Sequence, residues 1–153
     1  MAAAEAYTER LRELGLEVEI REFPEGTHTA QDAADAIGCP VAAIVKSLVF
    51  TLDGEPLLAL VSGANRVDTE ALGARLGGTL GKADARTVKE ATGFSIGGVP
   101  PLAHANPLHT VIDEDLLTLD VLWAAAGTAS SVFAIAPGDL VRLAGGEVLP
   151  VTR

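Results

Sequence analysis

The sequence predicts an α+β domain, spanning residues 1–153, in which short helices surround a mixed β-sheet. Three observations predict it. Apolar runs of strand length interleave with short segments of helical periodicity. Two connections resemble hairpins, most clearly Asp53-Gly54 between two apolar runs, so the sheet is not expected to be all parallel. No repeat, linker or low-complexity segment divides the chain, and 153 residues is an ordinary length for one domain.

Each helix is predicted from apolar residues at helical spacing, between a capping residue and a terminating glycine. In chain order they are 3–14 ended by Gly15, a second capped by Thr27 or Thr29 and ended by Gly38, 69–76 after Asp68, 85–92 after Asp84, and a short one opened by Pro137. Tyr7, Leu11 and Leu14 are the expected buried face of the first helix.

Each strand is predicted from alternating or continuous apolar residues next to turn signals. In chain order the strands are 16–20, 42–50, 56–63, 108–113, 116–127, 131–136 and 147–151. The stretch 93–107 holds three glycines and three prolines with little periodicity and is expected to be a loop. Asp113 and Asp115 are expected to cap and charge the start of a helix.

Lys46 is the residue of the predicted strands that most needs an explanation. Within residues 42–50, alternation places it on the face of Ile44, Leu48 and Phe50, which is the more apolar face. Such a charge can protect a sheet edge, or its amine can reach water beyond the strand. The run is apolar on both faces, which favours a central strand, where a lysine needs an anionic partner or a water-filled pocket. Periodicity alone leaves these alternatives open.

The glycine loop, "GFSIGGVPP" at residues 93–101, is the second feature with chemical potential. Gly97 and Gly98 allow close backbone approach, and Pro100 and Pro101 stiffen the chain after them. Such a loop can present main-chain groups to a phosphate, an oxyanion or a water, although many glycine–proline loops are only turns. It matches neither the dinucleotide fingerprint nor the nucleotide phosphate-loop pattern.

The net charge of −10 opposes general affinity for nucleic acid, and no DNA partner is expected. Residues 66–89 are an exception, with five basic and three acidic residues. The basic residues of this zone are Arg66, Arg75, Lys82, Arg86 and Lys89. The zone either receives one anionic partner or is an ordinary solvated surface.

Other classes of protein are excluded by composition. No apolar run approaches the ~18 residues of a membrane span, and the first residues lack a secretory signal, so we expect a cytoplasmic protein with no membrane partner. Cys39 is the only cysteine, which excludes an internal disulfide. His28, His104 and His109 are not spaced as metal ligands, so no metal is expected.

Four segments together carry a family resemblance. Lys46 in "AIVKSLVF" is followed by "ATGFSIGGVPPLAH", "HTVIDEDLL" and "SVFAIAPGDLVRLAGGEV". In this order, over roughly residues 16–151, they resemble the YbaK/prolyl-tRNA synthetase-associated domain family. The resemblance implies a twisted mixed sheet approaching a barrel. It also implies removal of wrongly attached amino acids from tRNA without a metal or other cofactor, with tRNA and a synthetase such as prolyl-tRNA synthetase as partners.

The resemblance also implies a mechanism and a set of site residues. Water attacks the aminoacyl ester, assisted by hydroxyls of the terminal ribose and by main-chain groups at Gly97, while Lys46 positions the phosphate or the ester. The expected substrate-binding residues are Phe23, Ser47, Gly98, Val99, Pro100 and His104. The basic residues of 66–89 are expected to contact the tRNA.

Two departures from the family pattern bear on the substrate. Relatives that clear cysteine carry serine and aspartate where this chain has Ala125 and Val132. A basic run of some relatives is replaced by "LAHANP", which has no lysine or arginine. The first departure leaves open which small amino acid is removed, as in cysteine- or alanine-charged proline tRNA. The second shifts the expected tRNA contact to residues 66–89 or to a partner synthetase.

The sequence supports three hypotheses about function. The leading one is an aminoacyl-tRNA deacylase that acts in trans on mischarged tRNA. The alternative is a non-catalytic module that binds a small molecule or a synthetase through the same pocket, favoured by the charge of −10. The third is a hydrolase of small esters or amides.

Overall fold

A computed structural model of the protein describes residues 3–23 and 29–153. The helices are α1 (Ala3–Glu13), α2 (Ala30–Ile37), α3 (Thr69–Leu76), α4 (Ala85–Thr92) and α5 (Pro137–Ala144), with 3₁₀ helices η1 (Val41–Ala43) and η2 (Glu114–Thr118). The strands are β1 (Ile20–Glu22), β2 (Ile44–Leu52), β3 (Glu55–Ser62), β4 (Leu80–Lys82), β5 (His109–Asp113), β6 (Leu122–Ala125), β7 (Ser131–Ile135) and β8 (Glu147–Leu149).

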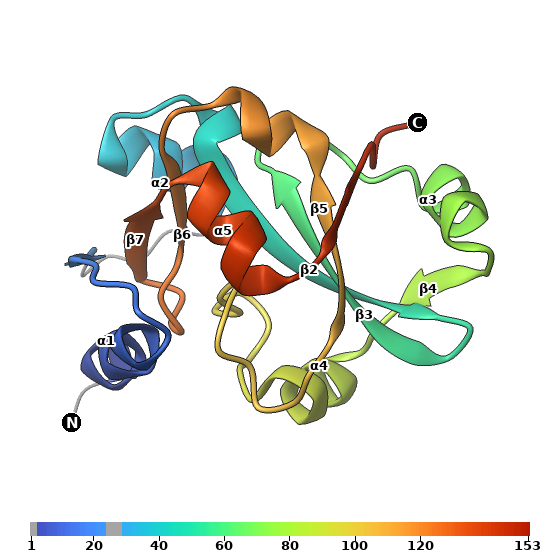
Figure 1. The fold of residues 1–153 in the computed structure, drawn as a ribbon, viewed down its shortest axis with the longest axis horizontal. Helices are drawn as coiled ribbons and strands as arrows, with labels where there is room; N and C mark the ends of the chain where they lie inside the picture. Colours follow the sequence, from blue (N-terminus) through green and yellow to red (C-terminus); the bar gives the residue numbers. More distant parts are fainter. Residues whose placement is uncertain (1–2, 24–28) are drawn as a thin grey trace.

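The strands form one mixed sheet in the order β1-β7-β6-β2-β3-β5-β8, and β4 pairs with β2 outside this path. Antiparallel pairs join β2 to β3 and β6 to β7, whereas β2–β6, β3–β5 and β5–β8 are parallel. The predicted mixed sheet and the central place of the Lys46 strand are therefore confirmed. The order has two ends, β1 and β8, so the described strands curve without closing into a barrel (Figure 1).

The hairpin between β2 and β3 fixes the register of the central strands. Leu52 pairs with Glu55 across a two-residue turn, in which Asp53 has φ of 49° and Gly54 has φ of 88°. Two positive φ angles are what a type I′ turn requires, and Asp-Gly is among its preferred sequences. The predicted hairpin is confirmed.

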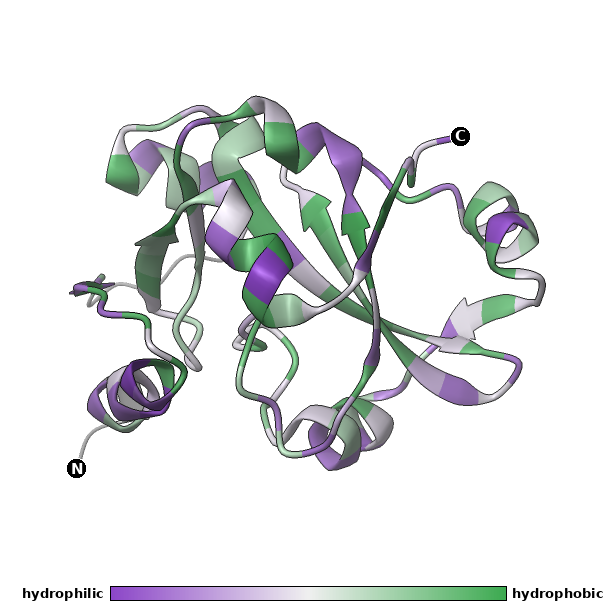
Figure 2. Cartoon of the chain, in the orientation of Figure 1, coloured by the Kyte–Doolittle hydropathy of each residue, from purple (hydrophilic) through white to green (hydrophobic). Residues whose placement is uncertain are grey.

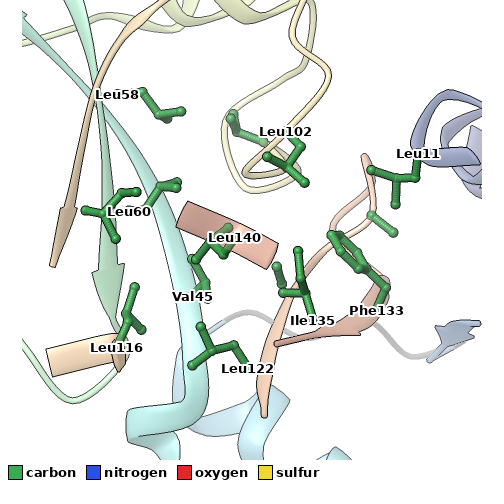
Figure 3. Packing of buried hydrophobic residues seen from close by; sticks show 14 of the residues in the cluster. Leu11, Val45, Leu58, Leu60, Leu102, Leu116, Leu122, Phe133, Ile135 and Leu140 are labelled. Carbon is green, nitrogen blue, oxygen red and sulfur yellow. The ribbon is translucent and has the colours of Figure 1, made fainter. Parts of the chain in front are cut away.

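The central strands bury both of their faces. The larger cluster, on one face, includes Leu58, Leu60, Leu122, Phe133 and Leu140 (Figure 3). The cluster on the other face includes Leu57, Ala59, Val61, Leu72 and Val111. Burial on both faces explains why β3 is an almost uninterrupted apolar run.

Helices cover both faces of the sheet. α1 and α5 pack against the larger cluster, α3 against the other, and α2 lies beside the start of β2. Hydrophobic residues follow the central strands, while polar residues mark the outer sides of the helices (Figure 2). The predicted caps Thr29, Asp68 and Asp84 accept main-chain N–H bonds, and Thr27 lies outside the described residues.

Some element boundaries were predicted wrongly. β1 begins only at Ile20, although Leu16 and Val18 pack against the larger cluster as their alternation indicated. An alternating apolar pattern indicates which side chains are buried. A segment can bury those side chains without hydrogen bonding to a neighbouring strand. The segment 114–118 is the 3₁₀ helix η2, and β4 was not predicted because three residues give too little pattern. Leu14 is 43% exposed, since it follows the last turn of α1.

Candidate functional site

The central strand β2 changes neighbours along one of its sides. It pairs with β6 at Ile44 and Val45 and with β4 over Phe50–Leu52, whereas residues 46–49 pair with β3 alone among the described strands. The main-chain oxygen of Ile44 accepts from Gly63 on the β3 side. By antiparallel alternation, the main-chain groups at residue 47 therefore point away from β3. The sheet has a gap beside residues 46–49.

A cavity of about 520 Å³ lies at this gap. Its walls come from β2, α2, β6, the segment 128–132 and the glycine loop, including Lys46, Ser47, Ala33, Trp123, Thr128 and Gly97. Among the described residues that line it, Lys46 carries the only charge. A mainly apolar cavity of this size with one charged group is typical of a small-molecule site.

Lys46 and Gly97, which lie far apart in the sequence, line the same cavity. The Lys46 Nζ donates to the main-chain oxygen of Asn65 at 2.6 Å. Burial lowers the pKa of Lys46, the nearby Arg66 lowers it further, and the charge of Asp113 acts in the opposite direction. An ammonium group has three N–H donors, so two remain for a ligand.

Both faces of β2 pack against hydrophobic residues. The face of Val45, Ser47 and Val49, which has the more polar composition, packs against the larger cluster, and Leu48 and Phe50 pack against the other. Ser47 lines the cavity, and its hydroxyl oxygen is buried without a hydrogen-bond partner among the described residues. Leaving such a group unpaired costs about 1–3 kcal/mol.

The glycine pair forms a tight turn in the wall of the cavity. Gly98 N–H donates to the Ser95 carbonyl at 3.0 Å, and Gly97 has φ of 91°, as the third residue of a type II turn requires. A Cβ on Gly98 would lie 3.1 Å from Thr128 Cα, so the turn packs closely on residues 128–129. Ile96, at the tip, lines the cavity and is 60% exposed.

The N-terminal helix holds this loop in place. The buried Tyr7 hydroxyl donates to the Leu102 carbonyl at 2.9 Å, and the Tyr7 ring meets Phe94 edge to face. Burial raises the pKa of Tyr7, which keeps the hydroxyl protonated as a donor. The Ala105 N–H donates to the Thr92 carbonyl at 2.9 Å, which joins the two ends of the segment that contains the glycine loop.

The remaining residues predicted to bind substrate lie at different depths. Val99 lines the cavity, while Gly98 and Pro100 are buried next to it. The Phe23 main-chain N–H bonds Ser130 beyond the end of β1, and its side chain does not line the cavity.

His104 does not share a cavity with Lys46. It lines a separate cavity of about 370 Å³, which also includes Leu143 of α5. Its Nε2 lies 2.6 Å from the Pro100 carbonyl, and burial lowers the pKa of its imidazole. The structure therefore brings together Lys46, Ser47, Gly97 and Val99, and leaves His104 apart.

The five basic residues of 66–89 differ in their surroundings. Three engage their own chain: Arg75 donates to the Arg153 carbonyl, Arg86 pairs with Glu90, and Lys89 donates to the Gly93 carbonyl. Arg66 is close enough to Lys46 to influence its pKa. Lys82 of β4 is the strand-register partner of Phe50 in β2, and its neighbour Ala83 lines the cavity. Arg66 and Lys82 are therefore the basic residues of the zone that neighbour the site.

The described part of the chain offers neither a metal-ligand cluster nor a membrane-spanning helix. Within residues 3–23 and 29–153, no three His, Cys, Asp or Glu side chains are grouped so that they could hold a metal ion. None of the helices found there is both long and apolar enough to cross a bilayer.

Comparison with known families agrees with this geometry. Residues 24–143 match the aminoacyl-tRNA editing domain family. The chain belongs to that family. A crystal structure provisionally described as a trans-editing enzyme for prolyl-tRNA synthetase is 40% identical to this editing domain, with a TM-score of 0.93 over 100% of this chain and 98% of that chain. The predicted family and fold class are confirmed.

Two curated relatives extend the comparison of this editing domain. The uncharacterized protein YwhH of Bacillus subtilis (strain 168) is 27% identical over 133 residues, which cover 86% of this chain and 85% of YwhH. The proline–tRNA ligase of Maridesulfovibrio salexigens is 36% identical over 78 residues, covering 50% of this chain. The match spans only 13% of the ligase, so the similarity concerns one small part of that enzyme.

Sequence reasoning missed three residues that shape the site, namely Tyr7, Asn65 and Asp113. Tyr7 was predicted only as part of a buried helix face, and Asp113 only as a cap, a role confirmed by the bond it accepts from Asp115 N–H. Asn65 gave no signal in the sequence. All three act through contacts between distant segments, which local patterns do not report.

Proposed function

We propose that this editing domain, residues 1–153, is a cytoplasmic aminoacyl-tRNA deacylase acting in trans on tRNA mischarged with a small amino acid. The observation that carries the proposal is the shared cavity of Lys46 and the Gly97 turn. Membership of the editing-domain family and the likeness to the provisionally described trans-editing enzyme support it.

The proposed reaction is hydrolysis of the ester between the amino acid and the terminal ribose. A water oxygen bonds to the ester carbonyl carbon, the bond from that carbon to the ribose oxygen breaks, and the ribose oxygen takes up a proton. Because an ester is an activated bond, positioning and stabilisation of the carbonyl oxygen are the main requirements. Lys46 holds the phosphate or the ester with its free N–H donors, and the turn at Gly97 presents main-chain groups to the reacting ester. Neither is a nucleophile, and the mechanism uses no metal.

The proposed substrate carries a small side chain such as alanine or cysteine on proline tRNA. The apolar cavity supports a small acyl group, and the similarity to part of a proline–tRNA ligase supports the tRNA and a synthetase partner. A small apolar pocket distinguishes one methylene by only about 1–3 kcal/mol. The domain would therefore act as a second sieve behind the synthetase.

A panel of tRNAs, each mischarged with one small amino acid, tests the proposal. We expect ester hydrolysis above the protein-free rate for at least one member, and a loss of that activity in Lys46→Ala. Hydrolysis of none would overturn the proposal. Hydrolysis of the mischarged tRNA that the protein accepts should be unaffected by EDTA. Inhibition by EDTA would contradict the metal-free mechanism.

The alternative is a non-catalytic module that binds a small molecule or a synthetase in the same cavity. The net charge of −10 favours it, as does the lack of basic residues in 102–107. This alternative predicts binding of a small ligand or of prolyl-tRNA synthetase in calorimetry, without hydrolysis and without tRNA affinity at low salt. Hydrolysis of free aminoacyl esters, but not of charged tRNA, would instead indicate a small-ester hydrolase.

A further inference from the structure

Asp113, the last residue of β5, is a buried carboxylate next to the proposed site. It is 1% exposed, and no ion pair among the described residues includes it. Its Oδ2 accepts from Ser62 N–H at 3.0 Å and from Asn65 Nδ2 at 2.8 Å, and its Oδ1 accepts from Asp115 N–H at 3.0 Å. All three partners are donors, which fits a carboxylate that accepts on both oxygens. Burying such a group is expensive, so its retention calls for a reason.

Asn65 links this carboxylate to Lys46. Its side-chain amide donates to Asp113 Oδ2 and, at 2.7 Å, to Asp115 Oδ2. Its main-chain N–H bonds the Ser62 carbonyl at 2.9 Å, and its own carbonyl accepts from Lys46 Nζ at 2.6 Å. The Ser62 hydroxyl donates to the Ala42 carbonyl just before β2. The turn 62–65 is therefore tied to β5, to η2 and to the segment that leads into β2.

The turn contacts Lys46 from outside the cavity lining, because Asn65 accepts from the Lys46 ammonium whereas neither Asn65 nor Asp113 lines the cavity. The charged groups that influence the ammonium are Arg66, which repels it, and Asp113, which attracts it. Asp115 of η2 reaches it only through the Asn65 amide. Among the described residues, only the Asn65 carbonyl accepts a hydrogen bond from the ammonium, which leaves two donors directed elsewhere.

We propose that Asp113, acting through Asn65, is a positioning residue that holds the turn 62–65 so that Lys46 presents its ammonium to the cavity. The rival explanation is purely structural, in which Asp113 only caps η2 and ties β3 to β5. The two explanations differ in one respect. Only the first predicts that loss of the uncharged Asn65 side chain, or of the Asp113 carboxylate, frees the Lys46 ammonium protons to exchange faster with water. The functional consequence rests on the proposed deacylase activity, but the positioning itself does not.

The chain has three lysines, Lys46, Lys82 and Lys89, which makes the ammonium directly observable. Protein labelled with ¹³C and ¹⁵N in lysine should give three side-chain signals by NMR, and the signal missing from Lys46→Arg is that of Lys46. In Asp113→Asn we expect the Lys46 pKa to fall under either explanation, because a charge that favours the ammonium is gone. Only the positioning explanation predicts that the Lys46 ammonium protons also exchange faster with water in this variant. In Asn65→Ala we expect faster exchange of the Lys46 ammonium protons with water, because their acceptor is no longer held.

A matched control separates positioning from loss of stability. Val111→Ala removes buried volume from the same strand, two residues before Asp113, without touching the hydrogen bonds of the turn. We expect it to lower the urea midpoint while leaving the Lys46 signal as in the wild type. If Asp113→Asn does not fold, Asn65→Ala decides alone, since Asn65 is only half-buried.

Kinetics supply the second readout. If the domain deacylates tRNA, Asp113→Asn and Asn65→Ala should lower kcat about tenfold to hundredfold with a smaller change in KM, because misplacement of a catalytic group acts mainly on the reacting geometry. Folded variants in which the Lys46 ammonium protons exchange with water as in the wild type would overturn the proposal. Lack of deacylation by the wild type would overturn the proposed function, while the NMR result would still decide the role of Asp113.

Discussion

Ala125 of β6 and Val132 of β7 are register partners in the sheet, and both line the cavity that contains Lys46. The family resemblance predicts that they stand where cysteine-clearing relatives carry serine and aspartate. The nearby hydroxyls of Thr128 and Ser131 are 2.6 Å apart and bond one another. This wall therefore offers a ligand side chain chiefly apolar contact, and its shape rather than its polarity should select the acyl group.

Ala125→Val tests selection by size. Two added carbons reduce the space at this wall, so kcat/KM should fall about tenfold or more for the largest amino acid accepted, and less for the smallest. Deacylation rates measured across the tRNA panel give the comparison. Ala134→Val, on β7 and outside the cavity lining, is the control and should leave the order of substrates unchanged. Equal losses for all substrates in Ala125→Val would contradict selection at this wall.

The lowered pKa of Lys46 predicts that stability and deacylation activity change with pH in opposite directions. Burial lowers its pKa below the ordinary 10.5, so activity that needs the ammonium should decline before that pH is reached. Between the lowered pKa of the folded protein and the ordinary pKa of the unfolded chain, the unfolded chain binds this proton more tightly than the folded protein does. The burial penalty is therefore fully present below the lowered pKa and disappears as pH rises.

Two measurements check these two directions of change. Relative to Lys46→Met, the wild type should gain free energy of unfolding in urea as pH rises through that window. Its deacylation rate, corrected for protein-free alkaline hydrolysis, should fall over the same window. A rate that stays constant up to pH 10.5 would show that the charge of Lys46 is not required.

The sequence carried enough information to predict the central hairpin, the helix caps and the resemblance. Asp53-Gly54, Thr29 and Asp68 act on neighbouring residues, where local chemistry decides the structure. Composition could not show how the two faces of β2 are covered, for a physical reason. Ser47 and Thr51 made one face look polar, but coverage of both faces of a central strand is set by distant helices.

The site was predictable only in part, for the same reason. Lys46 was identified by a charge inside an apolar run, and Gly97 by a glycine pair. Their meeting in one cavity depends on the gap between β6 and β4 along β2, and β4 is too short to give a sequence pattern. Asn65 became visible only through its contacts.

The position of the basic residues predicts how tRNA docks. Charge reversal at Arg66 or Lys82, which neighbour the cavity, should weaken tRNA binding more than reversal at Arg75 or Arg86, which contact their own chain. Each lost phosphate contact should reduce the slope of log affinity against log salt by about one. Fluorescence anisotropy with labelled tRNA at several salt concentrations measures both quantities. Unchanged affinity in all four variants would show that tRNA docks elsewhere.

The turn at Gly97 predicts a local effect on activity and stability. Its φ of 91° is unfavourable for any side chain, although a Cβ would meet nothing within 4 Å. Gly97→Ala should therefore cost about 1 kcal/mol through backbone strain and should displace the turn from the cavity, lowering kcat. Gly138→Ala is the matched control, because Gly138 lies in α5 with equally open space and no left-handed backbone.

Urea unfolding and single-turnover deacylation of both variants decide the matter. Gly138→Ala should be neutral or more stable, with unchanged kcat, because alanine favours a helix over glycine. Gly97→Ala should lose activity even after its smaller folded fraction is taken into account. A folded Gly97→Ala protein with full activity would mean that the main chain of this turn does not act on the reacting ester, and catalysis would then rest on Lys46 and the substrate's own hydroxyls.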